Sequence, residues 1–255
     1  MPAALAIVAH PDDIEFVMAG TMLLLAKRGW ELHYLNVADG SRGSQVTNCE
    51  DTARIRLAEA QDAASLLGAT FYPPIGRDME LTFDQPTLRR VAAIVRQVKP
   101  QIVLTHAPSD YMEDHEAVCR LAVTAAFCYA MPNFETDPPT ETFPGPVTIY
   151  HSQPHGNRTP MCELVVPHFA VNIAEVLPVK EAALACHASQ KDWLDASQGM
   201  GSYIQTMRDL CGEVGRMTKR FTIAEGWRRR QHWGFCGPND DPLREALRDQ
   251  IHDFN

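Results

Sequence analysis

The chain has 255 residues, of which 45% are hydrophobic and 22% charged, the usual balance of a globular protein. This composition excludes collagen-like, coiled-coil and disordered chains, and at about 150 residues per domain the length predicts one large domain or two small ones. The net charge of −9, with only one short basic run at 228–230, argues against nucleic acids and anionic membranes as partners.

The cysteines and the beginning of the chain indicate the cellular compartment. The seven cysteines are an odd number without a Cys-x-x-Cys pair, which predicts free thiols in a reducing environment. No basic segment followed by an apolar stretch opens the chain, and no apolar run approaches the roughly 20 residues of a membrane span. We therefore expect a cytoplasmic protein without a membrane partner.

The first half of the chain alternates between short apolar runs and longer segments of helical periodicity. The expected strands lie at 4–9, 32–37, 70–72 and 101–105, and the expected helices at 16–28, 53–67, 88–98 and 115–129. Strands that alternate with helices of this length indicate β–α–β units. We predict an α/β, Rossmann-like fold with a mostly parallel sheet and helices on both faces.

The second half of the chain has weaker signals. Five prolines between 131 and 146 predict a long loop. Further strands are expected at 147–151 and 169–173, and helices at 179–190 and 203–217, followed by a polar tail. Because no repeat or low-complexity linker divides the chain, we expect a single domain over residues 1–255.

Polar segments follow the first, second and fourth predicted strands, at 10–13, 39–43 and 106–115. Ligands of open parallel sheets bind beyond the carboxyl ends of the strands, where the strand order reverses. In the common strand orders, the first and fourth strands lie on either side of that point. The first and third of these segments are therefore expected to meet in one crevice.

Histidine and carboxylate side chains in these segments indicate a metal site. His10 and Asp13 are three residues apart at a strand-to-helix turn, and neutral imidazole with carboxylate suits Zn²⁺ with a position left for water. Asp12, between them, is a candidate base. The third ligand is either His115 or His106. The alternatives are that the aspartates cap the following helix and that His115 only begins one.

Several motifs, in order along the chain, resemble the PIG-L/LmbE family of zinc-dependent N-deacetylases. The first is Ala9-His10-Pro11-Asp12-Asp13-Ile14-Glu15-Phe16 with Ala19-Gly20-Thr21 behind it. The others are Arg56-x-x-Glu59, Asp78, Asp110-x-Met112-x-Asp114-His115, Lys180 with His187 and Ser189-Gln190, and Ala224-Glu225-Gly226-Trp227-Arg228. Together these blocks cover most of the chain and imply an LmbE-like fold.

The resemblance implies hydrolysis of an acetamido group by zinc-bound water. It assigns one zinc per chain to His10, Asp13 and His115, and the role of general base to Asp12. It also brings Arg56 and Asp78 to the substrate, whereas an exposed helix position paired with Glu59 is the alternative for Arg56. By family analogy we expect a homo-oligomer, a trimer or a hexamer.

Two further aspartates are candidates for contact with the metal-binding histidines. Such histidines usually donate their second ring N–H to a carboxylate or a carbonyl. Asp110 and Asp114 lie close to His115 in the sequence, so we expect them to be these partners, with a turn or capping role as the alternative. The same donor set also admits Fe²⁺, Co²⁺ or Mn²⁺.

The chain departs from the family pattern at Met112, where the family carries a histidine that stabilises the oxyanion or acts as an acid. A thioether cannot donate a proton. Either another residue takes this role or Asp12 is both base and acid. We expect His155 to supply the missing donor and His151, near it in the sequence, to reach the substrate.

The predicted function is the removal of an acetyl group from an N-acetylated amino sugar or its conjugate, a small-molecule substrate of the N-acetylglucosamine type. One alternative is an amidase of the same family that acts on a larger acyl group or a thiol conjugate. The other is a non-catalytic protein that binds a metal or a sugar. An intact Asp12 beside the ligands favours the enzyme, because a binding protein needs no base there.

Overall fold

Five parallel strands form the larger part of an eight-stranded sheet in the computed structural model, which describes residues 1–191 and 203–254. They are β1 (Ala3–Val8), β2 (Glu31–Asn36), β3 (Ala69–Tyr72), β4 (Ile102–Thr105) and β5 (Thr148–Ser152). The antiparallel strands are β6 (Phe169–Asn172), β7 (Ala224–Arg229) and β8 (Ile251–Asp253). Across the sheet the order is β3-β2-β1-β4-β5-β7-β6-β8.

The strand order reverses between β1 and β4, which are parallel neighbours at the centre of the sheet. Ala4 of β1 pairs with Leu32 of β2 on one side and with Ile102 of β4 on the other. Successive residues of β1 enter two separate hydrophobic clusters, Ala4 on one face and Leu5 on the other. The strand is therefore covered on both faces, and the predicted α/β fold with a mostly parallel sheet is confirmed.

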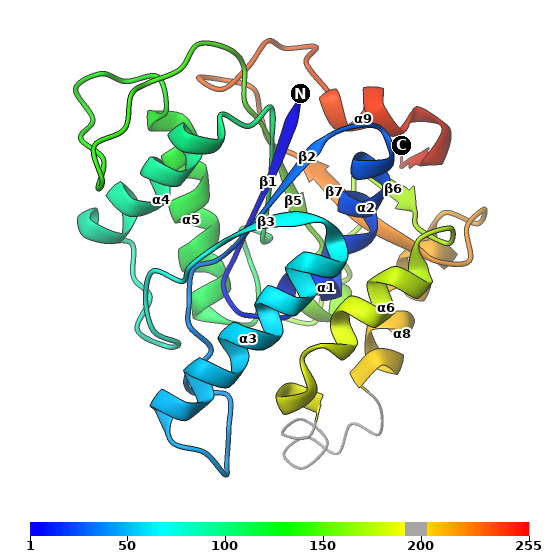
Figure 1. The fold of residues 1–255 in the computed structure, drawn as a ribbon. Helices are drawn as coiled ribbons and strands as arrows, with labels where there is room; N and C mark the ends of the chain where they lie inside the picture. Colours follow the sequence, from blue (N-terminus) through cyan, green and yellow to red (C-terminus); the bar gives the residue numbers. More distant parts are fainter. Residues whose placement is uncertain (192–202, 255) are drawn as a thin grey trace.

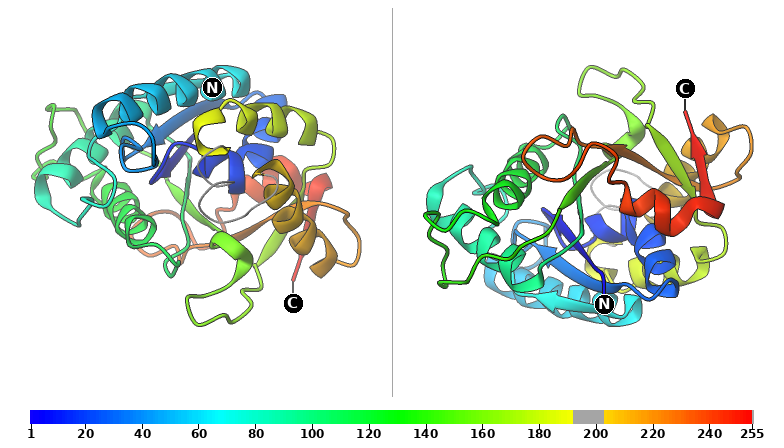
Figure 2. Two further views of the ribbon diagram at one scale, coloured as in Figure 1. Left: turned by 90° about the horizontal axis from the view of Figure 1, so that it is seen from below. Right: turned by 90° about the horizontal axis from the view of Figure 1, so that it is seen from above.

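Helices cover both faces of the sheet (Figure 1). One face carries α4 (Gln85–Val98) and α5 (Glu113–Cys128). The other carries α1 (Asp13–Val17), α2 (Ala19–Lys27), α3 (Cys49–Leu67), α6 (Leu177–Ala185), α8 (Tyr203–Met217) and α9 (Pro242–Leu247). The views from below and above in Figure 2 show the sheet between these two layers. None of the described helices is both long and apolar enough to cross a membrane.

Short 3₁₀ helices lie at His155–Asn157, after β5, and at Arg248–Gln250, before β8. The predicted single helix at 16–28 is two helices, because the chain leaves helical geometry at Met18 (φ −138°). Glu225 restarts the helix by accepting hydrogen bonds from the backbone N–H groups of Gly20 and Thr21, at 2.8 and 2.7 Å. The predicted helix at 179–190 is also interrupted: α6 ends at Ala185 and residues 188–191 are helical again.

The sequence analysis missed the strands β7 and β8. In β7, the sequence Ala-Glu-Gly-Trp-Arg-Arg has no run of apolar residues, although its first four residues are buried. Its Glu225 is buried because Lys180 lies opposite, with 2.6 Å between Nζ and Oε1. A charge that is neutralised by a distant residue cannot be recognised from local periodicity.

Candidate metal and active site

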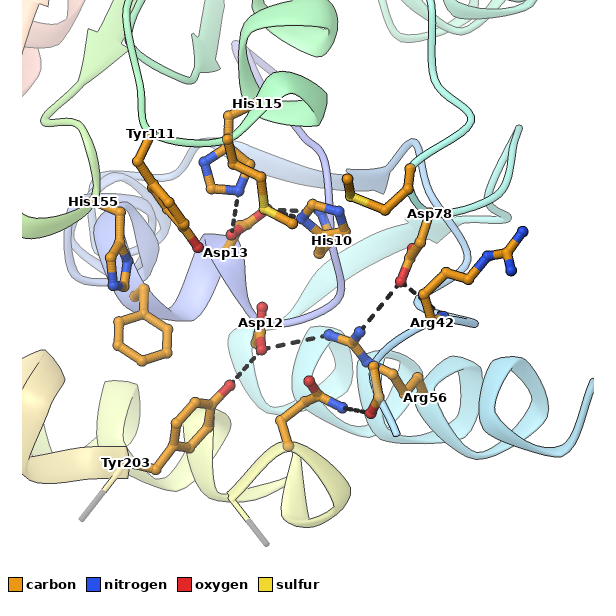
Figure 3. Close-up of a pocket in the computed structure, with 15 residues that line it drawn as sticks. His10, Asp12, Asp13, Arg42, Arg56, Asp78, Tyr111, His115, His155 and Tyr203 are labelled. Atoms are coloured by element: carbon orange, nitrogen blue, oxygen red, sulfur yellow. Dashed lines mark hydrogen bonds and ion pairs between the residues drawn. The ribbon is translucent and has the colours of Figure 1, made fainter. Parts of the chain in front are cut away.

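A cavity of about 330 Å³ lies where the polar segments after β1 and β4 meet (Figure 3). His10, Asp12 and Asp13 reach it from the first segment, and His115 from the beginning of α5. The expected convergence of these segments is therefore present. The lining also includes Phe16, Arg42, Gly43, Arg56, Asp78, Met79, Tyr111, Met112, His155, Gln190 and Tyr203.

The turn after β1 sends its two aspartates to different parts of the cavity. Asp12 has a left-handed backbone (φ 108°), a conformation that non-glycine residues adopt mainly where the surrounding structure enforces it. The carbonyl of His10 accepts hydrogen bonds from the Asn36 side chain at 2.6 Å and from the backbone N–H of Asp13 at 3.2 Å. Asp13 consequently faces the histidines, while Asp12 faces α3 and α8.

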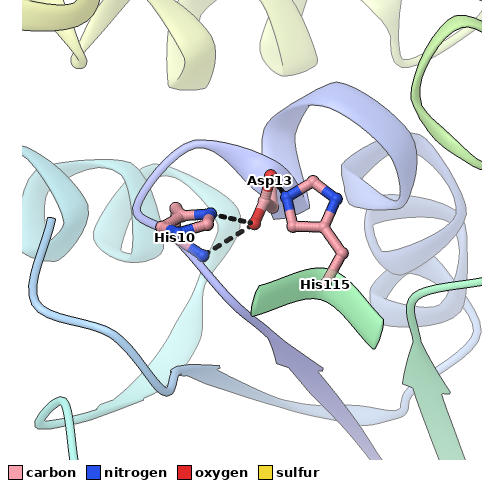
Figure 4. A group of neighbouring side chains, drawn as sticks. All are labelled: His10, Asp13 and His115. Atoms are coloured by element: carbon pink, nitrogen blue, oxygen red, sulfur yellow. Dashed lines mark hydrogen bonds and ion pairs between the residues drawn. The ribbon is translucent and has the colours of Figure 1, made fainter. Parts of the chain in front are cut away.

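His10, Asp13 and His115 form a compact group in which the potential ligand atoms lie within 4.8 Å of one another (Figure 4). The carboxylate of Asp13 lies 3.4 Å from Nδ1 of His10 and 3.4 Å from Nε2 of His115. Two imidazoles and one carboxylate within this distance match the donors of a divalent transition-metal site with further positions open.

The second ring nitrogen of each histidine contacts another carboxylate. Nε2 of His10 lies 3.1 Å from Asp114, and Nδ1 of His115 lies 3.0 Å from Asp110. Both aspartates are buried. These contacts orient the rings so that Nδ1 of His10 and Nε2 of His115 face Asp13, an arrangement typical of metal-binding histidines.

His106, the rival ligand, also lies close: its Nε2 is 3.4 Å from the Asp13 carboxylate, and with Asp110 and His115 it forms a second group of potential ligands. Its Nε2 accepts a hydrogen bond from the backbone N–H of Ala9 at 2.8 Å, so the lone pair of that nitrogen is occupied. The ring stacks on His115 with centroids 4.1 Å apart. Burial lowers the pKa of His106, which keeps the stacked ring neutral. The geometry therefore favours His115 over His106 as the third member of the group.

Contacts within this group of three residues strongly shift the pKa values of its members. Burial alone would lower the pKa of His10, but its contacts with Asp114 and Asp13 raise it to about 9. Burial has the same effect on His115, and there Asp13 and Asp110 raise the pKa to about 10. Burial would raise the pKa of Asp13, yet the charge of His115 and the contact with His10 hold it well below its ordinary value. Asp13 is thus a carboxylate, the form in which it binds a metal.

Asp12 lies apart from the histidines, between α3 and α8. Its Oδ2 accepts a hydrogen bond from the Tyr203 hydroxyl at 2.5 Å and lies 3.4 Å from the Arg56 guanidinium. Burial raises the pKa of Asp12, although Arg56 opposes the effect. A carboxylate with a raised pKa beside these potential metal ligands is suited to accept and return a proton near neutral pH.

Arg56 and Asp78 both reach the cavity, but their polar atoms are largely engaged by the protein. Arg56 is 3% exposed and donates to the carbonyl oxygens of Pro11 and Gly40, at 2.5 and 3.2 Å. A side chain on Gly40 would lie 2.7 Å from Arg56, so the loop needs glycine there. Asp78 accepts from the backbone N–H of Gly40 at 2.6 Å.

The alternative pairing of Arg56 with Glu59 is wrong. Glu59 instead accepts hydrogen bonds from the N–H and the hydroxyl of Ser189, at 2.8 and 2.6 Å. Arg56 is also buried, whereas that alternative placed it on the surface.

The structure separates the two histidines that were expected after β5. His155 lines the cavity, where its ring lies 5.6 Å from Phe16 and 5.4 Å from Tyr111 between centroids. His151 does not line it: Nδ1 donates to the carbonyl of His106 at 2.8 Å, and Nε2 accepts from Arg230 at 3.3 Å. Both ring nitrogens of His151 are therefore used inside the protein, and the expectation that this residue reaches the cavity is wrong.

Several cavity residues were not predicted as site residues, among them Tyr111, Gln190 and Tyr203. Tyr203 contacts Asp12 across 191 positions of sequence, so no local pattern connects the two residues. The amide of Gln190 donates to the carbonyl of Gly43 at 3.0 Å. For Tyr111 a signal existed, since it lies directly before Met112, the position of the family histidine.

Comparison with known proteins places these features in context. The family described as GlcNAc-PI de-N-acetylase, PIG-L, matches residues 5–126. The 4-oxalmesaconate hydratase of Pseudomonas putida is 30% identical over 199 residues, which cover 74% of each chain. The diacetylchitobiose deacetylase of Thermococcus kodakarensis is 28% identical over 194 residues, or 73% of this chain and 69% of the relative.

The solved structures include a similar fold. The 4-carboxy-2-hydroxymuconate hydratase from Pseudomonas putida superposes with a TM-score of 0.75 at 26% identity, covering 90% of this chain and 96% of the other. Enzymes named as deacetylases and as hydratases are therefore similar in sequence to this protein over about three quarters of its length, and one of the hydratases shares its fold.

Proposed function

This chain is an enzyme of the PIG-L deacetylase family, and on that basis we propose that it hydrolyses the acetamido group of an N-acetylated amino sugar or of its conjugate. The observation that carries the proposal is the pairing of two neighbouring aspartates with different surroundings. Asp13 contacts His10 and His115, whereas Asp12 is held by Tyr203 and Arg56. One carboxylate is suited to bind a cation and the other to move a proton.

The proposed cofactor is one Zn²⁺ per chain, held by His10, Asp13 and His115. Two imidazoles and a carboxylate, with Asp110 and Asp114 behind the rings, fit this ion by the chemistry of the donors. Bound there, zinc would lower the pKa of a water molecule and polarise the amide carbonyl. Fe²⁺, Co²⁺ and Mn²⁺ accept the same donors, so the native metal is a matter for measurement.

Asp12 would serve as the general base. Its carboxylate accepts the proton of the attacking water and returns it to the amide nitrogen, which leaves as an amine. The hydrogen bond from Tyr203 and the charge of Arg56 fix one carboxylate oxygen, Oδ2, so the other is available for this transfer. Water adds to the carbonyl carbon, the C–N bond breaks, and acetate and the amine are the products.

The charges of the cavity favour a neutral polar substrate. Asp12, Asp13 and Asp78 line it. Of the two arginines in its described lining, Arg56 is bound to backbone carbonyls and Arg42 donates to Glu80 at 2.5 Å. Outside the histidines that would hold the zinc, the described lining thus supplies little positive charge for an organic anion apart from the half-exposed Arg42, while an acetamido sugar needs none.

Hydration of an unsaturated carboxylate is the second candidate, because the relative from Pseudomonas putida is named a hydratase. Asp12 beside a metal group could also activate water for addition to a double bond. The two reactions are distinguished by their products: deacetylation releases acetate, whereas hydration releases nothing and removes the ultraviolet absorbance of the conjugated acid.

The metal content of the purified protein, followed by assays of acetate release, tests the proposal. We expect about one zinc per chain and release of acetate from N-acetylglucosamine or N,N′-diacetylchitobiose. His115→Ala should lose both, while His106→Gln should keep the metal. His33→Ala is the matched control, because His33 on β2 contacts Tyr72 and does not line the cavity. Loss of 4-oxalmesaconate absorbance without acetate release would replace the proposal with the hydratase.

A panel of N-propionyl and N-butyryl sugars and of thiol conjugates tests the alternative of a larger substrate. If the protein bound metal but turned over none of the compounds tested, the non-catalytic binding protein would be the alternative that remains.

We further propose that the chain forms one domain over residues 1–255 and assembles as a trimer or hexamer in the cytoplasm. The seven cysteines are all free, which agrees with a reducing compartment. Size-exclusion chromatography with light scattering measures the assembly, and a monomer would contradict it.

A further inference from the structure

The replacement of the family histidine by Met112 leaves the cavity without an obvious donor for the oxygen that becomes negative during hydrolysis. Met112 lines the cavity, and its backbone carbonyl accepts the N–H of His115 at 3.1 Å at the beginning of α5. Its thioether has no proton to donate. A hydrogen-bond donor that is already in position stabilises the negative oxygen of the tetrahedral intermediate. We therefore expect another group to supply this donor.

Most other donors in the described lining are already committed. The Tyr203 hydroxyl donates to Asp12, and the Gln190 amide donates to Gly43. Arg56 donates to backbone carbonyls, and its Nε, which has no partner, lies against Gly40. Arg42 donates to Glu80 from a half-exposed position. Apart from the histidines of the metal group, two side chains remain whose polar atoms bond to no described residue: Tyr111 and His155.

Of these two residues, Tyr111 lies nearer to His10, Asp13 and His115, the proposed metal ligands. Its ring packs edge-on against His115, with centroids 5.6 Å apart and an interplanar angle of 86°. Figure 3 shows its hydroxyl directed toward Asp13, with the ring between His115 and His155. An ordinary phenol has a pKa of about 10, so the hydroxyl keeps its proton at neutral pH.

The backbone on both sides of Tyr111 is held in place. Asp110 donates its N–H to Glu116 at 2.9 Å, and its carboxylate contacts His115 at 3.0 Å and the backbone N–H of His155 at 3.2 Å. Met112, on the other side, begins α5. The tyrosine is therefore fixed at both neighbours, although the residue itself is 61% exposed and accessible to a ligand.

We propose that Tyr111 is a catalytic residue that takes the place of the family histidine by hydrogen-bonding the carbonyl oxygen of the scissile amide. The inference rests on the proposed amide hydrolysis. As water adds to the carbonyl carbon, the π electrons move to this oxygen, and the Tyr111 hydroxyl donates to the growing negative charge without transferring its proton. Asp12 carries the proton from the water to the leaving nitrogen, so Tyr111 begins and ends the cycle as a phenol.

This assignment replaces His155, which we expected to supply the donor. The ring of His155 lies behind Tyr111 as seen from His115 and packs against Phe16. We infer that His155 packs behind Tyr111 and holds its ring in position.

Four variants test the inference: Tyr111→Phe, His155→Gln, Met112→His and the double variant Tyr111→Phe/Met112→His. Each is checked for metal content and melting temperature, then assayed for acetate release. Affinity for an N-methylphosphonyl analogue of glucosamine, whose tetrahedral phosphorus resembles the intermediate, is measured by calorimetry beside affinity for N-acetylglucosamine itself. The analogue gives a readout that does not depend on turnover.

We expect Tyr111→Phe to lower kcat by about 10²–10³, the usual loss for one such donor, with KM little changed. It should weaken the phosphonyl analogue far more than N-acetylglucosamine. His155→Gln, which removes packing behind the tyrosine, should lower kcat less and should weaken the two ligands to the same extent. Adding Met112→His to Tyr111→Phe should recover part of kcat, which a merely structural tyrosine would not allow.

Full kcat in Tyr111→Phe, or the same loss in His155→Gln alone, would overturn the assignment while leaving the deacetylase intact. A wild-type protein that binds metal but hydrolyses no N-acyl sugar would overturn the proposed function, and the role of Tyr111 with it.

Discussion

The parallel and antiparallel parts of the sheet use buried charge in opposite ways. At the ends of β1 and β4, His10, Asp13 and His115 direct their polar atoms toward one another beside a cavity. On the antiparallel side, the buried pair of Lys180 and Glu225 is closed. Glu225 accepts two backbone N–H groups as well as Lys180, which also donates to the carbonyl of Phe16 at 2.9 Å.

The difference shows that burial and charge alone do not identify a functional site. A buried ion pair whose donors and acceptors are all used holds elements together, in this case α6, β7 and the beginning of α2. Charged groups that converge beside an open cavity retain capacity for a ligand. Mutations in the two regions should therefore affect different measurable properties.

The largest effect is expected from Asp12→Asn, which removes the proposed base without removing a ligand. We expect kcat for acetate release to fall by about 10²–10⁴, the range of general acid–base catalysis, with metal content and melting temperature unchanged. The neighbouring Asp13→Asn should instead lose the metal. If Asp12→Asn retained more than a tenth of kcat, the base would have to be another group.

Lys180→Met should affect stability and tests the closed pair. Removing one partner of a buried ion pair leaves the other charge uncompensated, so the free energy of unfolding should fall by about 3–5 kcal/mol in urea titrations. Lys27→Met is the matched control, because Lys27 pairs with Glu175 at the exposed surface and should lose at most about 1 kcal/mol. Equal losses in the two variants would remove the distinction between the regions.

His151 lies on β5, at the border between the two regions, and gives stability a pH dependence. Burial, with Arg230 and Arg228 nearby, lowers its pKa to about 4, so the folded protein keeps this ring neutral. The unfolded chain has an ordinary histidine pKa of about 6.5. The contribution of the neutral His151 ring to the free energy of unfolding is therefore complete above pH 6.5. It is lost as the pH falls toward 4.

The corresponding measurement compares the wild type with His151→Gln. Between pH 7.5 and 4.5 the wild type should lose about 2–3 kcal/mol more of its unfolding free energy than the variant. Parallel curves for the two proteins would mean that His151 becomes protonated in the folded state at an ordinary pKa.

The parallel region could be predicted because its positions follow from topology. Apolar runs identified β1 and β4, and the rule for strand ends brought His10, Asp13 and His115 together. The spacing of these residues already set Asp12 apart as a candidate base, and the resemblance to the family implied the same role. Local patterns could not decide between His106 and His115, because the hydrogen bond from the Ala9 N–H to His106 depends on the pairing of two strands.

The antiparallel region could not be predicted to the same extent. β7 has a charged sequence that only Lys180 makes compatible with burial, and the hydroxyl of Tyr203 meets Asp12 from the far end of the chain. His151 and His155 lie four residues apart, yet one faces the interior and the other the cavity, because the chain leaves β5 between them. Sequence proximity alone did not reveal that change of direction.

The carboxylates around His10 and His115 have a consequence for the protein when no metal occupies the proposed site. With pKa values of about 9 and 10, both imidazoles would be protonated at neutral pH, and together they carry the two positive charges that a divalent ion would bring. Protons can therefore substitute for the ion electrostatically. Chelation should leave the protein folded, unlike a zinc finger, and reloading should acidify an unbuffered solution.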